Sequence, residues 1–181
     1  MSAAGDTIYA LSSGALPSGV AVVRVSGKDA FSCCRAITGE VPAPRKARLM
    51  RLVDAAGSPI DTALVLAFAG PASFTGEDCI EFQLHGGRAV VRALLDRLAG
   101  LGLRHAEAGE FTRRAFENGK IDLVEAEGLS DMIAAETEMQ RRLALEQAGG
   151  GLLPDANRPL SSTADRHVVH VPIAASAPHA R

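Results

Sequence analysis

The sequence predicts an α/β (α+β) domain, a mixed β-sheet with flanking helices, followed by the first helix of an α-helical domain. The apolar run Val20–Val25 is rich in valine, which is typical of a strand. Strict alternation over Cys79–His85 predicts another strand, and apolar residues at helical spacing over Arg88–Leu101 predict an amphipathic helix. Apolar residues make up 47% of the chain and aromatic residues 4%, so we expect one aliphatic core.

Composition excludes several classes of protein. With 19 basic and 21 acidic residues the net charge is −2, so no broad basic field is available to hold nucleic acid by its phosphates. The three cysteines are odd in number and have no zinc spacing, which favours reduced thiols. The N-terminus lacks the pattern of a signal peptide, and no apolar run is long enough to span a bilayer. We therefore expect a cytoplasmic protein with no membrane contact.

The N-terminal part begins with a short strand, Thr7–Leu11, and a loop, Ser12–Ser18, rich in glycine, proline and serine. The near-continuous apolar character of Val20–Val25 predicts a strand covered on both faces. Arg24 interrupts that strand, and a buried guanidinium is costly unless it is paired. Arg24 therefore either points outward at the strand end or meets an anion.

A helix, a connector and a hairpin are expected next. Apolar residues at helical spacing predict a helix over Asp29–Ile37, and two prolines mark Thr38–Lys46 as a connector. Leu49–Val53 and Ala63–Phe68 are predicted strands, and Asp54–Gly57 is the turn between them.

The stretch from Pro71 to Gly87 is the strongest candidate for a site. Along its strand, Glu81, Gln83 and His85 share one face, and a glycine turn then opens a helix whose free N–H groups favour anions. That layout is typical of a small-molecule site. The alternative is a half-exposed antiparallel strand with a solvated polar face.

The C-terminal half is predicted to be mainly helical. Leu103–Ala106 is a candidate edge strand, and Glu110–Asn118 a short helix. Asp122 and Glu125 form a capping-box pattern that predicts a longer helix, which we expect to reach about Gln147. The far half of that helix carries apolar residues for which the sequence offers no obvious partner.

Three catalytic patterns can be tested and set aside. No G-x-x-x-x-G-K-[ST] loop is present, so we expect no GTP binding by this chain. His85-Gly86-Gly87 is similar to an esterase oxyanion motif, but no G-x-S-x-G accompanies it. Glu107 and Glu110 could form an acid–base pair, although carboxylates beside a helix dipole explain them better. The sequence therefore predicts no catalytic residue.

Four motifs, in order, resemble the N-terminal domain of the tRNA-modification GTPase family MnmE, also called TrmE. The resemblance spans roughly residues 6 to 149 and is carried by Asp6-Thr7-Ile8, Gly19–Gly27, Gly70–Gly87 and Ala108–Ile133.

The resemblance implies the fold, the cofactor and the assembly. That family domain is similar to the one-carbon folate-binding fold of glycine-cleavage T-protein, binds a tetrahydrofolate derivative (5-formyl- or methylene-tetrahydrofolate) and forms a homodimer. Its folate-contacting positions fall on Arg24, Glu81 and Lys120. We expect Glu81 to bind the pterin, and Arg24 or Lys120 to face the acidic tail. Without the family, Lys120 is better explained as a cation at a helix C-terminus.

The resemblance also implies a division of the chain. Residues 1–119 would be the folate-binding and dimerisation domain, and residues 120–148 the start of a helical domain, truncated before the GTPase domain. Residues 149–181 are unrelated to the family and rich in Pro, Ala, Ser and His, so we expect a disordered tail without a metal site.

The implied function is carboxymethylaminomethyl-type modification of the wobble uridine of tRNA, together with the FAD-dependent partner MnmG. GTP, potassium and magnesium would serve only the full-length family. Two alternatives stay open: a stand-alone folate-dependent one-carbon transferase that resembles T-protein, and a dimerisation fragment with no activity.

Overall fold

The computed structural model describes residues 5–148, so the predicted tail and the first four residues lie outside the described part. A six-stranded sheet has the strand order β3-β4-β5-β2-β1-β6. The strands are β1 (Ile8–Leu11), β2 (Ser18–Ser26), β3 (Arg48–Val53), β4 (Pro59–Phe68), β5 (Cys79–Gly86) and β6 (Arg104–His105). The helices are α1 (Ala30–Thr38), α2 (Arg88–Gly100), α3 (Glu110–Glu117), α4 (Leu123–Ala134) and α5 (Glu138–Ala148).

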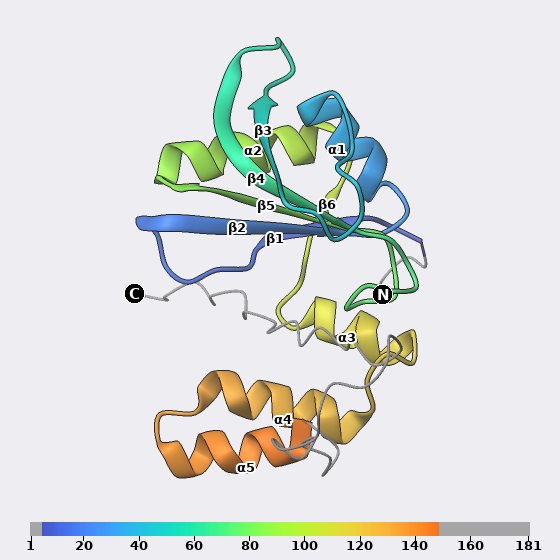
Figure 1. Cartoon of the computed structure of the whole chain (residues 1–181), viewed down its shortest axis with the longest axis vertical. Coiled ribbons are helices and arrows are strands. Elements are labelled where there is room, and N and C mark those ends of the chain that lie inside the picture. Colours follow the sequence, from blue (N-terminus) through green and yellow to red (C-terminus); the bar gives the residue numbers. More distant parts are fainter. Residues whose placement is uncertain (1–4, 149–181) are drawn as a thin grey trace.

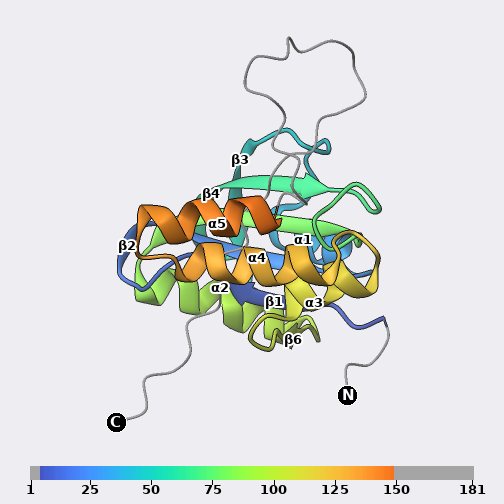
Figure 2. The same ribbon diagram turned by 90° about the horizontal axis from the view of Figure 1, so that it is seen from below.

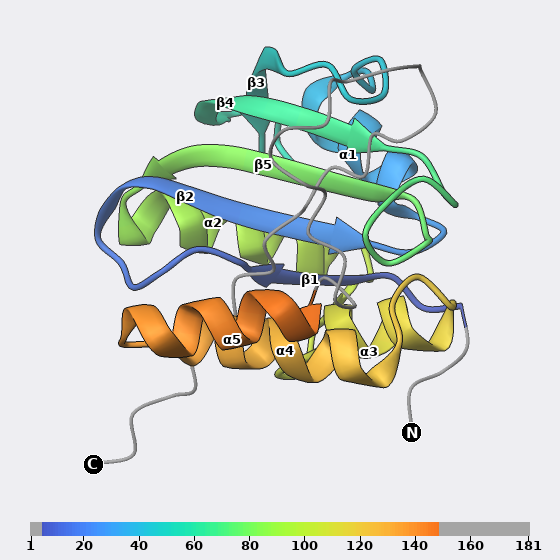
Figure 3. The ribbon, with the colours of Figure 1, turned by 60° about the horizontal axis from the view of Figure 1, so that its bottom comes forward.

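The sheet is mixed, as the sequence predicts. Within the described residues β6 runs parallel to β1, and every other pair of neighbouring strands is antiparallel. Helices α1 and α2 cover one face of the sheet, while α3, α4 and α5 lie on the opposite side (Figure 1). With its lower side turned forward, the molecule shows α4 and α5 in front of the β1 side, and α2 behind the sheet (Figure 3).

The hydrophobic core lies between the sheet and the pair α1 and α2. Alternate residues of the two central strands point into it, including Val23, Val25, Ile80 and Phe82, all completely buried. The first half of β2 departs from expectation, because Val20 is 59% exposed. Coverage on both faces therefore holds only toward the C-terminal end of this strand.

The hairpin between β3 and β4 has the predicted turn. Asp54 Oδ1 accepts hydrogen bonds from the amides of Ala56 and Ser58, both at 2.8 Å, and Gly57 takes a positive φ of 80°. Strand β4 begins at Pro59, earlier than predicted, because the pairing with β3 continues to the turn.

The prediction of a single long helix that reaches about Gln147 is wrong, although the predicted start of the helix is confirmed. Asp122 and Glu125 form the predicted capping box, but the helix ends at Ala134. A second capping box begins α5, since the Gln140 amide donates to Thr137 Oγ1 at 3.2 Å and Gln140 Oε1 accepts from the Thr137 amide at 3.0 Å. Helices α4 and α5 therefore form a hairpin, which runs side by side in Figure 2.

The close approach of these two helices depends on a glycine. A Cβ atom added at Gly128 would lie 2.5 Å from the backbone nitrogen of Ala148, so a side chain there would push α5 away. Helix α5 packs against α4, but Met139 and Leu143, two of the apolar residues for which the sequence offers no partner, remain 69% and 54% exposed. None of the helices within residues 5–148 is both long and apolar enough to cross a membrane.

Candidate functional site

The centre of the candidate site is a buried ion pair on two neighbouring strands. Arg24 on β2 lies directly opposite Glu81 on β5. Nε and Nη2 of Arg24 both donate to Oε1 of Glu81, at 3.0 and 2.8 Å. Arg24 is 5% exposed and Glu81 4% exposed. Arg24 therefore meets an anion rather than pointing outward at the strand end. The alternative of a solvated polar face on β5 does not hold at Glu81, because this residue is buried.

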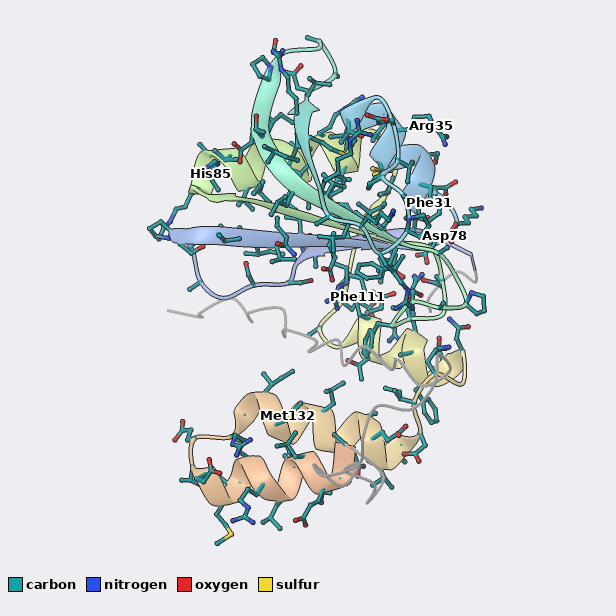
Figure 4. The ribbon with its side chains drawn as sticks, viewed as in Figure 1. Phe31, Arg35, Asp78, His85, Phe111 and Met132 are labelled. Carbon is teal, nitrogen blue, oxygen red and sulfur yellow. The ribbon has the colours of Figure 1, made fainter. Side chains whose placement is uncertain are left out.

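His85 lies at the other end of the same strand face and plays a different part. Its ring Nδ1 is 2.9 Å from Asp61 Oδ1, and its amide donates to Asp61 Oδ2 at 2.9 Å. The His85 ring is exposed and lies away from Phe111 in Figure 4. His85 therefore does not join the buried pair.

Two aromatic rings flank the Arg24 guanidinium. Its central carbon lies 5.9 Å from the centroid of Phe74, in the loop before β5, and 5.5 Å from that of Phe111, in the first turn of α3. A guanidinium at this distance from an aromatic face is attracted by the ring quadrupole. The Arg24 guanidinium thus contacts the rings of Phe74 and Phe111 where α3 approaches the sheet.

A cleft of about 370 Å³ opens beside Arg24 and Phe111, between strands β1 and β2 and helices α3 and α4. Its walls are mainly apolar, and Arg24 and Arg113 contribute its cations. The lining residues are Ala10, Leu11, Ser12, Arg24, Glu107, Gly109, Phe111, Thr112, Arg113, Phe116, Leu123, Ala126, Leu129, Ser130 and Ile133. This volume falls within the range of small-molecule sites.

Lys120 lies apart from the pair. It is exposed, follows the end of α3, and does not line the cleft. Its amide donates to the Ala115 carbonyl at 2.8 Å, and its side chain lies so near Gly76 that an added Cβ would be 3.2 Å from it. The structure therefore brings Arg24 and Glu81 together and leaves Lys120 outside the cleft lining, beside Gly76 of the loop that carries Phe74.

A second polar cluster, which sequence reasoning missed, fixes α3 to the sheet. Glu110 begins α3, is 1% exposed, and pairs with Arg104 of β6. Arg104 also donates to Asp6 Oδ2 at 2.7 Å. Burial would raise the pKa of Glu110, but hydrogen bonds from Arg104, the Glu107 amide and Arg114 outweigh it and lower the pKa to about 2. Glu110 is therefore a structural anion rather than an acid–base catalyst.

Arg114 extends the same cluster to the loop before β5. It contacts Asp6, pairs with Glu110 at 3.3 Å, and donates to Glu77 Oε1 at 3.1 Å. Glu77 Oε2 in turn accepts from Ser26 Oγ at 2.7 Å. The i, i+4 spacing of Glu110 and Arg114 was a visible signal of pairing, but the two other partners of Arg114, Asp6 and Glu77, lie far away in sequence.

Hydrogen bonds also tie α3 directly to that loop. Asn118 Nδ2 at the end of α3 donates to the Thr75 carbonyl at 2.7 Å, and Thr75 Oγ1 is 2.7 Å from Ser26 Oγ. These hydrogen bonds fix the loop that carries Phe74 and the helix that carries Phe111 relative to each other, so both rings keep their positions beside Arg24.

The fold is that of an α/β domain with a mainly apolar cleft, of the size of small-molecule sites, between its sheet and its C-terminal helices. The sequence model of a family described as "GTP-binding protein TrmE N-terminus" matches residues 7–120. The chain belongs to this family, as the four motifs predict.

Curated relatives agree with the family. The chain is similar to "tRNA modification GTPase MnmE" of Rhizobium meliloti (strain 1021), with 65% identity over 147 residues, 81% of this chain and 34% of the relative. The protein of the same name from Caulobacter vibrioides is 59% identical over 147 residues, 81% of this chain and 33% of the relative. The chain thus spans about a third of the length of these relatives.

Proposed function

We propose that this chain is the tetrahydrofolate-binding and dimerisation portion of a tRNA modification GTPase. The observation that carries the proposal is the buried Arg24–Glu81 pair beside an apolar cleft with an aromatic wall. A pterin presents adjacent N–H donors on one edge, which a carboxylate accepts as a bidentate pair, and a flat ring that packs against Phe74 and Phe111. Glu81 and the two rings therefore fit the cofactor head group.

The acidic tail of the folate would need cations nearby. Arg24 lines the cleft and is the first candidate. Lys120 is exposed and separated from the cleft lining, so its part in binding requires its flexible side chain to reach around the Gly76 loop. The bound tetrahydrofolate would supply the one-carbon unit, either from 5-formyl- or methylene-tetrahydrofolate.

Homodimerisation is proposed to use the open face of the sheet. Leu49 on β3 lies directly opposite Leu64 on β4, and these side chains are 65% and 42% exposed. Their row continues to Gln83 on the strand face that carries Glu81. A second copy that covers this row would bury apolar area without disturbing the core. Leu64→Asp should therefore produce monomers in sedimentation velocity, whereas Leu143→Asp, at an exposed leucine of α5, should leave dimers intact.

The relatives' name gives tRNA modification as their role, and the finer role proposed here rests on the family resemblance. We propose action in carboxymethylaminomethyl-type modification of wobble uridine in tRNA, in the cytoplasm, with the FAD-dependent partner MnmG. GTP, potassium and magnesium would be used elsewhere in a full-length protein, because the 181 residues contain no G-x-x-x-x-G-K-[ST] loop. The purified chain should therefore not hydrolyse GTP, and measurable hydrolysis would refute this assignment.

Calorimetric titration with 5-formyltetrahydrofolate tests whether Glu81 binds the pterin. Glu81→Gln removes the charge that accepts the pterin edge and should weaken binding about tenfold or more. Glu40→Gln, an exposed glutamate in a surface ion pair with Arg48, is the matched control and should bind as the wild type does. Equal affinity in Glu81→Gln and the wild type would show that Glu81 does not hold the pterin.

A further inference from the structure

The chain places one of its own side chains where the pterin edge is proposed to bind. The Arg24 guanidinium is planar, donates from Nε and Nη2 to Glu81 Oε1, and lies within 5.5 and 5.9 Å of the centroids of Phe111 and Phe74. A 2-amino-4-oxopyrimidine ring has the same features: a flat π-system with neighbouring N–H donors on one edge. The Glu81 carboxylate and the two phenylalanine rings can therefore bind either the guanidinium or the pterin ring.

Access to Glu81 depends on the same arginine. Arg24 lines the cleft, whereas its ion-pair partner Glu81 on β5 does not. A ligand that enters the cleft therefore meets the guanidinium before the carboxylate. Direct contact with Glu81 requires Arg24 to move.

We infer that Arg24 is a self-ligand that occupies the head-group subsite of the cleft and is exchanged for the pterin on binding. This inference rests on the proposed function and deepens it. Once displaced, the long Arg24 side chain remains anchored to β2 at the cleft, where its charge can meet the acidic tail of the same ligand. The exchange explains how Arg24 and Glu81, paired with each other here, can contact opposite ends of one folate.

The exchange makes Arg24 a specificity-determining residue with opposite effects on two ligands. A tetrahydropterin without a glutamate tail must displace Arg24 from Glu81. It has no carboxylate that could form a new ion pair with the displaced guanidinium. A folate regains part of that free energy through its tail carboxylates. The wild-type chain should therefore discriminate strongly in favour of folates, and removal of Arg24 should weaken that discrimination.

Calorimetry with 6-methyl-5,6,7,8-tetrahydropterin and 5-formyltetrahydrofolate tests this on the full chain. Arg24→Ala should bind the tetrahydropterin roughly tenfold more tightly than the wild type, because the competing occupant is gone. The ratio of its affinities for folate and tetrahydropterin should fall by a larger factor. Arg51→Ala, at an exposed arginine of β3, is the control and should change neither affinity.

Guanidinium ion provides a readout that does not depend on folate. Low millimolar guanidinium chloride should raise the melting temperature of Arg24→Ala and compete with the tetrahydropterin, but do neither with the wild type. If Arg24→Ala does not fold, Arg24→Lys, which keeps the charge but not the planar donor edge, should show the same gain in tetrahydropterin affinity to a smaller extent.

Unchanged or weaker tetrahydropterin binding by the Arg24 variants would overturn the exchange. If the wild type still bound 5-formyltetrahydrofolate in that case, the proposed function would stand without it. If no protein bound either compound, the folate function would fail and the exchange with it.

Discussion

Arg24 and Glu81 face each other across β2 and β5, and their side chains form an ion pair of 2.8 Å in which both are almost entirely buried. Glu81→Ala should destabilise the chain by about 3–5 kcal/mol, because it leaves the Arg24 charge buried and unpaired. Replacement of both residues by leucine should cost less than this single change. Urea unfolding measures both. Glu40→Ala, which breaks the exposed pair with Arg48, should cost about 1 kcal/mol or less.

The Glu110 cluster should make the stability of the chain sensitive to acid. The pKa of Glu110 is lowered from 4.5 to about 2 in the folded chain. Its ionisation therefore stabilises the fold above about pH 4.5, and this contribution, on the order of 3 kcal/mol, is lost as the pH falls toward 2. Denaturant unfolding between pH 5 and 2 should be less pH-dependent in Glu110→Gln than in the wild type.

Glu117→Gln is the matched control for this experiment. Glu117 lies on the same helix, and its side chain is 57% exposed. Its variant should retain the steep acid dependence of the wild type. Equal steepness in Glu110→Gln would contradict the assignment of the acid-sensitive group.

Gly128 should be the residue that permits the α4–α5 hairpin. In an isolated helix, Gly→Ala stabilises by about 1 kcal/mol. At Gly128 the new Cβ would meet the Ala148 backbone at 2.5 Å, so Gly128→Ala should instead increase amide hydrogen exchange in α5. Gly100→Ala, at the end of α2 where an added Cβ meets nothing within 4 Å, should show no such increase. Slower exchange in α5 of Gly128→Ala would contradict the packing described.

The capping box of α5 should have a measurable local effect. Thr137→Ala removes the oxygen that accepts from the Gln140 amide and should destabilise α5 by about 1 kcal/mol. Hydrogen exchange should rise in the first turn of α5 and not in β2 or β5. Thr62→Ala, on β4, is a control outside the hairpin.

Local patterns predicted most of the fold. Strand alternation at Cys79–His85 and helical periodicity at Arg88–Leu101 gave elements that the structure confirms closely. The break after Ala134 was missed because apolar residues occur at helical spacing on both sides of it, up to Ile133 and again from Met139. The signal was nevertheless present, since Thr137 and Gln140 have the same capping spacing as Asp122 and Glu125.

The site was less accessible to sequence reasoning. Arg24 interrupts an apolar strand and Glu81 lies on the polar face of an alternating strand, but the sequence did not show that they pair with each other. Their contact depends on the register of β2 and β5, and register is a property of the assembled sheet. The same holds for Asp6 and Arg114, which meet only because α3 folds back across the start of β1.

Equilibrium dialysis of the purified wild-type chain against labelled 5-formyltetrahydrofolate tests whether the cleft binds folate. We expect saturable binding that approaches one ligand per chain and is competed by unlabelled compound. Cooperative thermal unfolding of the same sample establishes that the protein is folded. A folded chain that retains no labelled ligand at any concentration tested would contradict the assignment of this cleft as a folate site.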